Sequence, residues 1–148
     1  MTTDPTRAEA HRIWEQWIAL WNGDLAIGKE LLADRITVHS PKLSDSIDPS
    51  LIGDRDSALA LIGGVQAIAE LTYTTEVGPV AEGAYLTGGW RFAGTYRGGL
   101  PEATAAPGTP VANRGIDILR IEQGRVVEWW SAAENLQLLF TLGLLHAG

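Results

Sequence analysis

Apolar residues recur with helical spacing in the first part of the chain. Within residues 4–22 they form one stripe, made of Ile13, Trp14, Trp17, Ile18 and Trp21. We therefore expect a helix over this segment, with Asp4 as its capping residue. Two further helices are predicted over residues 24–33 and 54–69, and Asp54 is placed to cap the second of them.

The pattern changes to the alternation of strands in the second half. Strands are predicted over residues 36–39, 72–80, 84–97, 111–121 and 125–130, and a last helix over residues 132–145. Helices, then a meander of strands, then a closing helix indicate an α+β fold. We expect a cone-shaped α+β barrel, in which a curved antiparallel or mixed sheet wraps around the N-terminal helices. A cavity should open where sheet and helices diverge, and residues 1–148 should form a single domain.

Composition excludes several classes of function. The net charge is −7, with 18 acidic against 11 basic residues, and there is no cysteine. The lack of cysteine excludes disulfides, thiolate zinc sites and a cysteine nucleophile. Negative charge without a basic patch argues against binding of nucleic acid or anionic membranes. The polar N-terminus lacks a signal-peptide core, which makes the cytoplasm the expected location.

Metal and cofactor sites find no support in the sequence. His11, His39 and His146 lack the spacing that is typical of metal ligands. The chain contains neither a dinucleotide-binding glycine pattern in its proper context nor a Walker motif. We therefore expect a protein that works without a metal and without a cofactor.

The second half also carries residues found in a known family. They are Gly94-Thr95, Arg97-Gly98, Gly108-Thr109-Pro110-Val111, Gly115-Ile116-Asp117-Ile118 and Gly124-Arg125-Val126-Val127-Glu128, followed by Trp130. With these residues the chain resembles the SnoaL-like polyketide cyclase group of the nuclear-transport-factor-2-like superfamily. The resemblance implies the fold described above and a small hydrophobic ligand. It does not select a reaction, because the superfamily includes isomerases, cyclases, epoxide hydrolases and plain binding domains.

A departure from the family lies near the end of the last strand. By the resemblance, relatives keep an aspartate at the position of Ser131, on the same face as Trp129 two residues before it. Serine cannot act as a general acid near neutral pH. The base of steroid-isomerase-like relatives is likewise replaced by Ser40, and residues 90–95 lack the Arg-x-Asp of epoxide-hydrolase-like relatives. A mechanism copied from any of these branches would lack one member.

Two residues are predicted to carry acid/base chemistry. Strand alternation sends Asp117 into the cavity, where desolvation would raise its pKa and suit it to proton transfer. The alternative for Asp117 is an ion pair with Arg114. His39 is expected to face the cavity and move a proton, or else to form a structural hydrogen bond at its strand end. Asn113, on the same face as Asp117, could donate a hydrogen bond to a ligand oxygen.

The other candidates are predicted to bind the substrate. Trp129 is expected to form a wall of the cavity, whereas Trp90 and Trp17 either line it or fill the core. Ser131 and Glu134 are either pocket residues or the two members of a capping box that starts the last helix.

The sequence thus predicts a cofactor-free cyclase or isomerase acting on an apolar polyketide- or terpenoid-like ligand, with Asp117 and His39 moving the proton. Three alternatives stay open: a non-catalytic binding protein with a degenerate site, an epoxide-hydrolase-like enzyme, and a structural dimer with a filled cone. A cavity below about 300 Å³ would favour the filled cone. Trp130, which lies on the opposite strand face from Trp129, suggests a homodimer surface.

Overall fold

The computed structural model describes residues 4–145, so His146 lies outside the described residues. Its helices are α1 (Arg7–Trp21), α2 (Leu25–Leu31), α3 (Arg55–Ile68) and α4 (Asn135–Leu142), with a short 3-10 helix η1 (Pro49–Leu51). Its strands are β1 (Leu32–His39), β2 (Ala69–Glu82), β3 (Tyr85–Tyr96), β4 (Pro110–Glu122) and β5 (Arg125–Ala133). The predicted helices and strands are all present, although β1 and β2 begin earlier and β5 ends later than expected.

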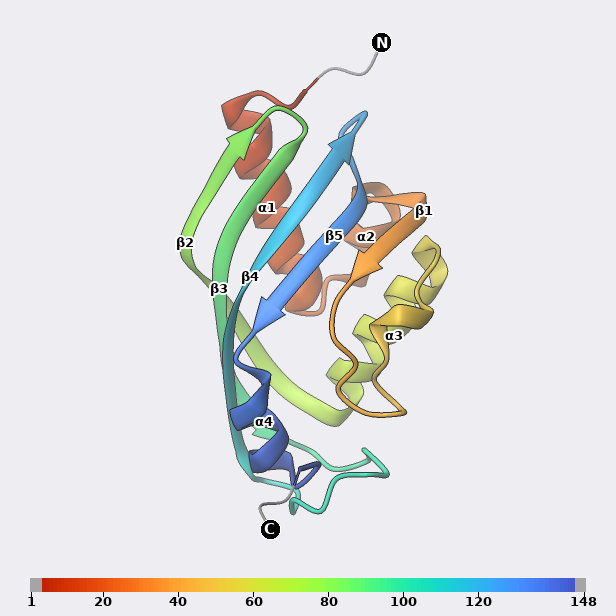
Figure 1. Ribbon diagram of the computed structural model, residues 1–148, viewed down its shortest axis with the longest axis vertical. Coiled ribbons are helices and arrows are strands. Elements are labelled where there is room, and N and C mark those ends of the chain that lie inside the picture. The colour runs from red at the N-terminus through yellow and green to blue at the C-terminus, as the bar shows by residue number, and fades with distance from the viewer. Residues whose placement is uncertain (1–3, 146–148) are drawn as a thin grey trace.

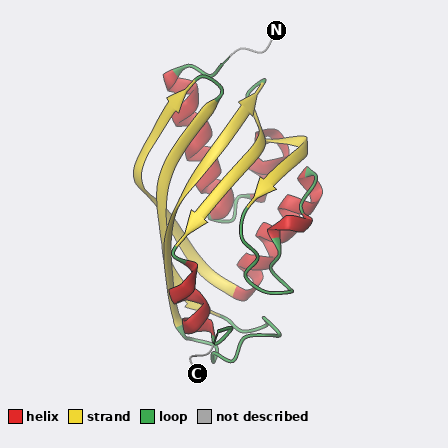
Figure 2. Ribbon diagram, in the orientation of Figure 1, coloured by secondary structure: helices red, strands yellow, loops and turns green. Residues whose placement is uncertain are grey.

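The strands form one mixed sheet in the order β1-β5-β4-β3-β2. Neighbouring strands run antiparallel, except that β1 pairs in parallel with β5 at one edge. The sheet curves around α1, with α2 and α3 on the β1 side and α4 directly after β5 (Figure 1). Figure 2 shows the long helix α1 lying behind the strands. The expected α+β fold, with a curved mixed sheet, N-terminal helices and a C-terminal helix, is therefore confirmed.

Helix α1 is buried along one stripe because it lies against the inner face of the sheet. Its buried residues are Ala10, Ile13, Trp14, Trp17 and Leu20. Its N-cap is Thr6, whose hydroxyl accepts a hydrogen bond from the Glu9 N–H, so the prediction of Asp4 as the cap is wrong. At the other end, the Asn22 side chain donates to the Tyr73 carbonyl (3.0 Å) and accepts from the Tyr73 N–H (2.7 Å). These two bonds fix the end of α1 to β2.

The capping signal at Asp54 is confirmed. Asp54 caps α3 by accepting from the Ser57 N–H at 2.7 Å, and the Ser57 hydroxyl accepts from the Asp54 N–H in return. Between β4 and β5, Gln123 and Gly124 both have positive φ, 51° and 76°. This pair of conformations is typical of a type I′ turn, whose twist matches that of the flanking strands.

Over residues 4–145, no helix combines the length and the apolar character that a membrane crossing needs. Within the same range, His, Asp and Glu side chains do not gather into a group of three that could hold a metal ion.

Glycine at position 94 is required by the close approach of β2 and β3, and we expect Gly94→Ala to destabilise the protein. A β-carbon there would overlap the backbone carbonyl of Glu70, which cannot swing away as a flexible side chain could. We expect a loss of about 1–3 kcal/mol or more in the free energy of unfolding, measured by urea denaturation.

The matched control is Gly64→Ala in the exposed part of α3, where no atom lies within 4 Å of an added β-carbon. Because alanine is the better helix former, this variant should gain about 0.5–1 kcal/mol. Equal stability of the two variants would contradict the assigned contact between β2 and β3.

Candidate active site

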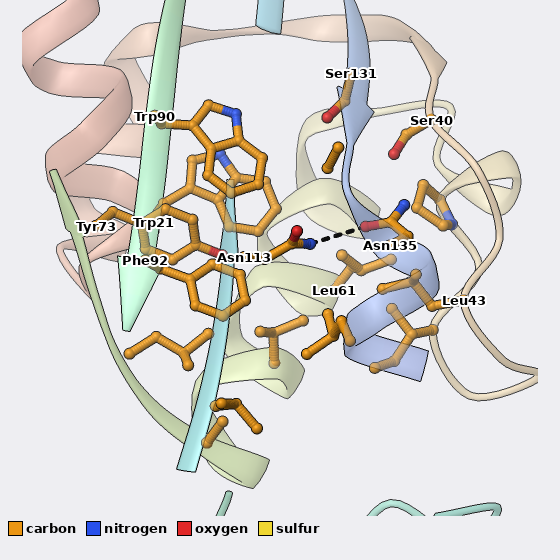
Figure 3. A pocket seen from close by; sticks show the side chains of 18 of the residues that line it. Trp21, Ser40, Leu43, Leu61, Tyr73, Trp90, Phe92, Asn113, Ser131 and Asn135 are labelled. Atoms are coloured by element: carbon orange, nitrogen blue, oxygen red, sulfur yellow. Dashed lines mark hydrogen bonds between the residues drawn. The ribbon is translucent and has the colours of Figure 1, made fainter. Parts of the chain in front are cut away.

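A cavity opens between the inner face of the sheet, helices α1, α3 and α4, and the loop that follows β1 (Figure 3). Its volume is about 140 Å³. Aromatic side chains form much of its wall: Trp17, Trp21, Tyr73, Trp90, Phe92, Tyr96 and Trp129. Its polar side chains are Ser40, Asn113, Asp117, Ser131 and Asn135. The structure thus brings together all of the predicted site residues except His39 and Glu134.

Asp117 lies on β4 at the base of this cavity and is only 5% exposed. Its Oδ2 accepts a hydrogen bond of 2.9 Å from the indole N–H of Trp17 on α1. Its Oδ1 is buried and has no hydrogen-bond partner among the described residues. The alternative ion pair with Arg114 is wrong, because Arg114 lies on the outer face of the sheet and pairs with Glu76. One carboxylate oxygen is therefore held by Trp17, and the other has no partner within residues 4–145.

Burial raises the pKa of the Asp117 carboxyl above its usual range. The polar groups of Trp90, Trp17 and Ser131 oppose this rise, because they interact favourably with the ionised form. The nearby phenol of Tyr73 responds to the same environment: burial, and then the charge of Asp117, raise its pKa. Tyr73 therefore stays neutral over the pH range in which Asp117 titrates.

Two indole N–H groups at the cavity are also without partners. Nε1 of Trp21 and Nε1 of Trp90 are buried, and neither donates a hydrogen bond to any of residues 4–145. A buried donor left unpaired costs about 1–3 kcal/mol, so most such groups in folded proteins have a partner. Together with Asp117 Oδ1, these are the three buried side-chain atoms of the described chain that lack a partner, and all three residues line the same cavity. These three buried atoms belong to residues of the cavity wall, and each would gain a hydrogen-bond partner if a bound molecule reached it.

The orientation of Trp90 follows from its partner on the neighbouring strand. Trp90 on β3 is paired with Gly115 on β4. A β-carbon at Gly115 would lie 2.7 Å from Cζ2 of Trp90, so the indole rests on the bare backbone of β4. The sequence contained this signal, since a glycine within a strand often marks a close approach by another group.

At the mouth of the cavity, Asn113 Nδ2 donates a hydrogen bond of 2.9 Å to Asn135 Oδ1 (Figure 3). Asn113 comes from β4, and Asn135 is the first residue of α4. The bond holds the start of α4 against the sheet and leaves the second N–H of Asn113 Nδ2 for another acceptor.

Ser131 and Glu134 do not form a capping box. Strand β5 continues past Ser131 to Ala133, because Ser131 is paired in the ladder with Asp117 and its side chain joins the cavity. Helix α4 starts later, with Glu134 as its N-cap and without a side-chain cap bond among the described residues. Glu134 is exposed and does not line the cavity, so its predicted place at the substrate is wrong.

His39 does not reach the cavity, so its predicted inward orientation is wrong. In the parallel ladder His39 is paired with Trp130, which faces outward, and the two rings stack with centroids 4.9 Å apart. His39 Nε2 lies 2.7 Å from a carboxylate oxygen of Glu128, whose pKa is lowered by His39 and by Arg120. This is the structural hydrogen bond at a strand end that was the alternative reading.

Sequence reasoning missed Tyr73, Phe92 and Asn135 as cavity residues. Tyr73 and Phe92 are paired across β2 and β3, and their rings lie 5.1 Å apart on the inner face. Strand alternation could have found both, because each lies an even number of residues from another inward position. Asn135 could not be found in this way, because its place depends on where β5 ends.

We expect Asp117→Asn to stabilise the protein by an amount that depends on pH. The folded-state pKa of Asp117 is raised, so the folded protein holds a proton that the unfolded chain releases above about pH 4. The wild-type protein therefore loses stability as pH rises from about 4 through the raised pKa, whereas the asparagine variant does not. Each unit of raised pKa corresponds to about 1.4 kcal/mol.

The measurement is urea unfolding of both proteins at a series of pH values from about 4 to 8. The difference in free energy of unfolding should grow with pH and then level off once Asp117 is ionised in the folded protein. Glu15→Gln, on the exposed side of α1, is the control and should show no such trend. A difference for Asp117→Asn that does not change with pH would contradict the raised pKa.

Comparison with solved structures shows the same fold in other proteins. TsrD from Streptomyces laurentii is 23% identical, with a TM-score of 0.77 over 96% of this chain and 100% of TsrD. IdmH from Streptomyces antibioticus, a proposed polyketide cyclase, is 25% identical, with a TM-score of 0.73 over 90% of this chain and 98% of IdmH. AclR from Streptomyces galilaeus, a proposed hydroxylase, is 23% identical, with a TM-score of 0.74 over 95% of this chain and 100% of AclR.

Among functionally curated proteins, no match to the chain was found. The family profile described as SnoaL-like polyketide cyclase matches residues 11–142, which include every strand and the cavity. The chain therefore belongs to the SnoaL-like polyketide cyclase family.

Proposed function

We propose that this protein is a cofactor-free acid/base enzyme, of the cyclase or isomerase type, in which Asp117 transfers the proton. The observation that carries the proposal is a buried carboxylate in the wall of an aromatic cavity, with one oxygen held by Trp17 and the other without a partner among residues 4–145. A carboxyl group with a raised pKa is suited to proton transfer near neutral pH.

The proposed chemistry needs one proton acceptor and one stabiliser of an oxygen. Asp117 Oδ1 would take a proton from a carbon next to a carbonyl group, and the bonding electrons would move onto the carbonyl oxygen. The N–H of Trp90, with Asn113 as a second donor, would stabilise the resulting enolate. Return of the proton to another carbon gives an isomer. Alternatively, the enolate carbon attacks a second carbonyl of the same molecule and closes a ring, and Asp117 then returns its proton to the alkoxide oxygen formed there.

The pairing of β4 with β5 supports Asp117 as a substitute for the acid that relatives keep at position 131. Asp117 and Ser131 are directly opposite in the ladder, and both face the cavity. Directly paired residues have β-carbons about 4.5–5.5 Å apart, which is within the reach of an aspartate side chain. The carboxylate of Asp117 on β4 can therefore act close to the position that an aspartate at position 131 on β5 would reach.

The second candidate is ligand binding without turnover. It is favoured by the serine at position 131 and by a cavity of about 140 Å³, which is below the roughly 300 Å³ of typical pockets for drug-sized ligands. The same small volume favours the alternative of a structural dimer whose cone is filled by its own side chains. The unpaired N–H groups of Trp21 and Trp90 argue against it, because a bound molecule would give them partners. The epoxide-hydrolase-like alternative has less support, because no arginine lines the cavity within residues 4–145.

We expect the wild-type protein to exchange the protons next to the carbonyl of a cyclic ketone with solvent deuterium, and Asp117→Asn to lose this activity. Cyclohexanone is the probe, and 1-tetralone, which has a second fused ring, is the larger comparison; exchange is followed by proton NMR. Loss of a general base lowers the rate by about 100- to 10,000-fold. The rate in the wild type should rise with pH through the raised pKa of Asp117, because only the ionised carboxylate can accept the proton.

Glu134→Gln is the matched control, since it removes an exposed carboxylate outside the cavity. Exchange that survives in Asp117→Asn would remove Asp117 from the mechanism. Ketones that bind to the wild type without any exchange would favour the binding protein over the enzyme.

We also propose that a second copy of the chain covers the outer face of the sheet. Exposed apolar side chains from β2, β3 and β4 gather there: Val77, Val80, Tyr85, Ile116 and Ile118. Trp130 adjoins them, with its ring 6.1 Å from that of Tyr85. Monomeric proteins rarely expose a contiguous apolar patch of this kind, and a two-fold axis would pair the patch with itself.

We expect sedimentation at micromolar concentration to give the mass of a dimer for the wild type and that of a monomer for Ile118→Lys. The introduced charge would be buried without a partner in the pair. Leu51→Lys, at a residue that is 77% exposed on η1, is the control and should remain dimeric. A monomeric wild-type protein would refute the interface.

A further inference from the structure

The charges at the cavity restrict the ligands that it can hold. Among residues 4–145, Asp117 is the one aspartate or glutamate that lines it, and no lysine, arginine or histidine does so. A ligand carboxylate or phosphate would therefore face Asp117 in a medium of low dielectric constant without a positive partner. This arrangement disfavours anionic ligands.

The free donors restrict the ligand further. An aromatic wall with a carboxylate could attract an organic cation through its ring faces. A cation, however, has no lone pair for the indole N–H groups of Trp21 and Trp90, which would remain buried and unpaired. An oxygen that accepts from an indole N–H satisfies these donors and carries no charge.

Asp117 and Trp90 act on one part of the cavity. Trp90 is paired with Gly115, which lies two residues from Asp117 on the same face of β4, and both Trp90 Nε1 and Asp117 Oδ1 lack a partner within the described chain. A hydroxyl group placed between them can accept from Trp90 and donate to Asp117 Oδ1. The enol form of a ketone offers the same pair of interactions.

The size of the cavity sets the third limit. A dry cavity of about 150 Å³ in another protein accommodates benzene, whereas drug-sized molecules need roughly 300 Å³ or more. At about 140 Å³, this cavity is close in volume to the one that holds a single benzene ring and lies below the range for drug-sized ligands.

We propose that the cavity selects a neutral compound with one six-membered ring that carries a hydroxyl or an enolisable carbonyl. The oxygen accepts a hydrogen bond from Trp90, and the ring lies against the aromatic wall formed with Trp17, Trp129 and Tyr73. This specificity rests on the proposed function, since the bound ring is the part of the substrate that reacts at Asp117.

Probes that share one ring but differ in charge test the inference directly. Benzyl alcohol, benzoate and benzylammonium are titrated into the full-length wild-type protein by isothermal calorimetry. Benzyl alcohol should bind at least about 10-fold more tightly than either ion, because like charge or an unpaired donor penalises the ions. Tightest binding of benzoate or of benzylammonium would overturn the proposal.

A second series varies ring number with the same substituent: benzyl alcohol, 1-naphthalenemethanol and 9-anthracenemethanol. Affinity should fall by at least about 10-fold between the one-ring and three-ring probes, since overfilling a packed cavity is unfavourable. Rising affinity along this series would overturn the size limit, and failure of all three to bind would overturn the proposal as a whole.

The role of Trp90 is tested with Trp90→Phe, which removes the N–H but keeps a ring on Gly115. Affinity for benzyl alcohol should fall by about 2- to 10-fold, while that for toluene, which has no oxygen, should not fall. Trp130→Phe on the outer face is the control and should leave both affinities unchanged. Equal affinities of Trp90→Phe and wild type for benzyl alcohol would overturn the assigned hydrogen bond.

A second test of the same hydrogen bond uses the wild-type protein, so that its result does not depend on the stability of Trp90→Phe. The Trp90 indole N–H resonance, identified by its loss from the spectrum of that variant, should shift on addition of benzyl alcohol and much less on addition of toluene. Binding of benzyl alcohol without ketone exchange would leave this ligand class intact and refute the enzyme. Asp117-dependent proton exchange that occurs only with larger ring systems would support the enzyme and refute the one-ring ligand class.

Discussion

The hydrogen bond between the Trp17 indole and the Asp117 carboxyl joins the central helix to the middle of the sheet. It links residues 100 positions apart in the sequence, and both side chains are almost fully buried. The same tryptophan packs edge-on against Trp129 at 5.0 Å, so one side chain of α1 contacts two neighbouring strands. A carboxylate would be costly in this apolar interior without such a donor. The bond therefore makes the position of Asp117 possible and decides which of its oxygens faces the cavity.

The fold could be predicted from the sequence because its signals are local and agree with one another. The stripe of Ile13, Trp14 and Trp17 specifies the buried side of α1, and Asp54 marks the start of α3. The period-two pattern after residue 70 specifies the meander, and the turn at Gly124 fixes the register of its last hairpin. Each signal depends on a few adjacent residues, and tertiary packing reinforces rather than overrides it.

The site could be predicted only where strand alternation was sufficient. Asp117 and Asn113 share one face of β4 with the buried residues Val111, Leu119 and Ile121, so strand alternation alone predicts their inward orientation. His39 ends an edge strand, and its outward orientation is set by parallel pairing with Trp130, a partner distant in the sequence. Ser131 resembles a helix cap in sequence, but its ladder partner Asp117 keeps it in the strand. Errors arose where a long-range partner, rather than a neighbour, decides the conformation.

The absence of a side chain at Gly115 affects the size of the cavity. The Trp90 ring rests where a side chain at position 115 would otherwise lie. Any larger residue would collide with the Trp90 ring and with the backbone carbonyl of Ala132, 2.6 Å from an added β-carbon, so both the indole and the neighbouring part of β5 would have to move. The size of the cavity thus depends on a missing side chain beneath one of its walls, and a single added methyl group there would displace the very indole whose N–H is proposed to hold the ligand.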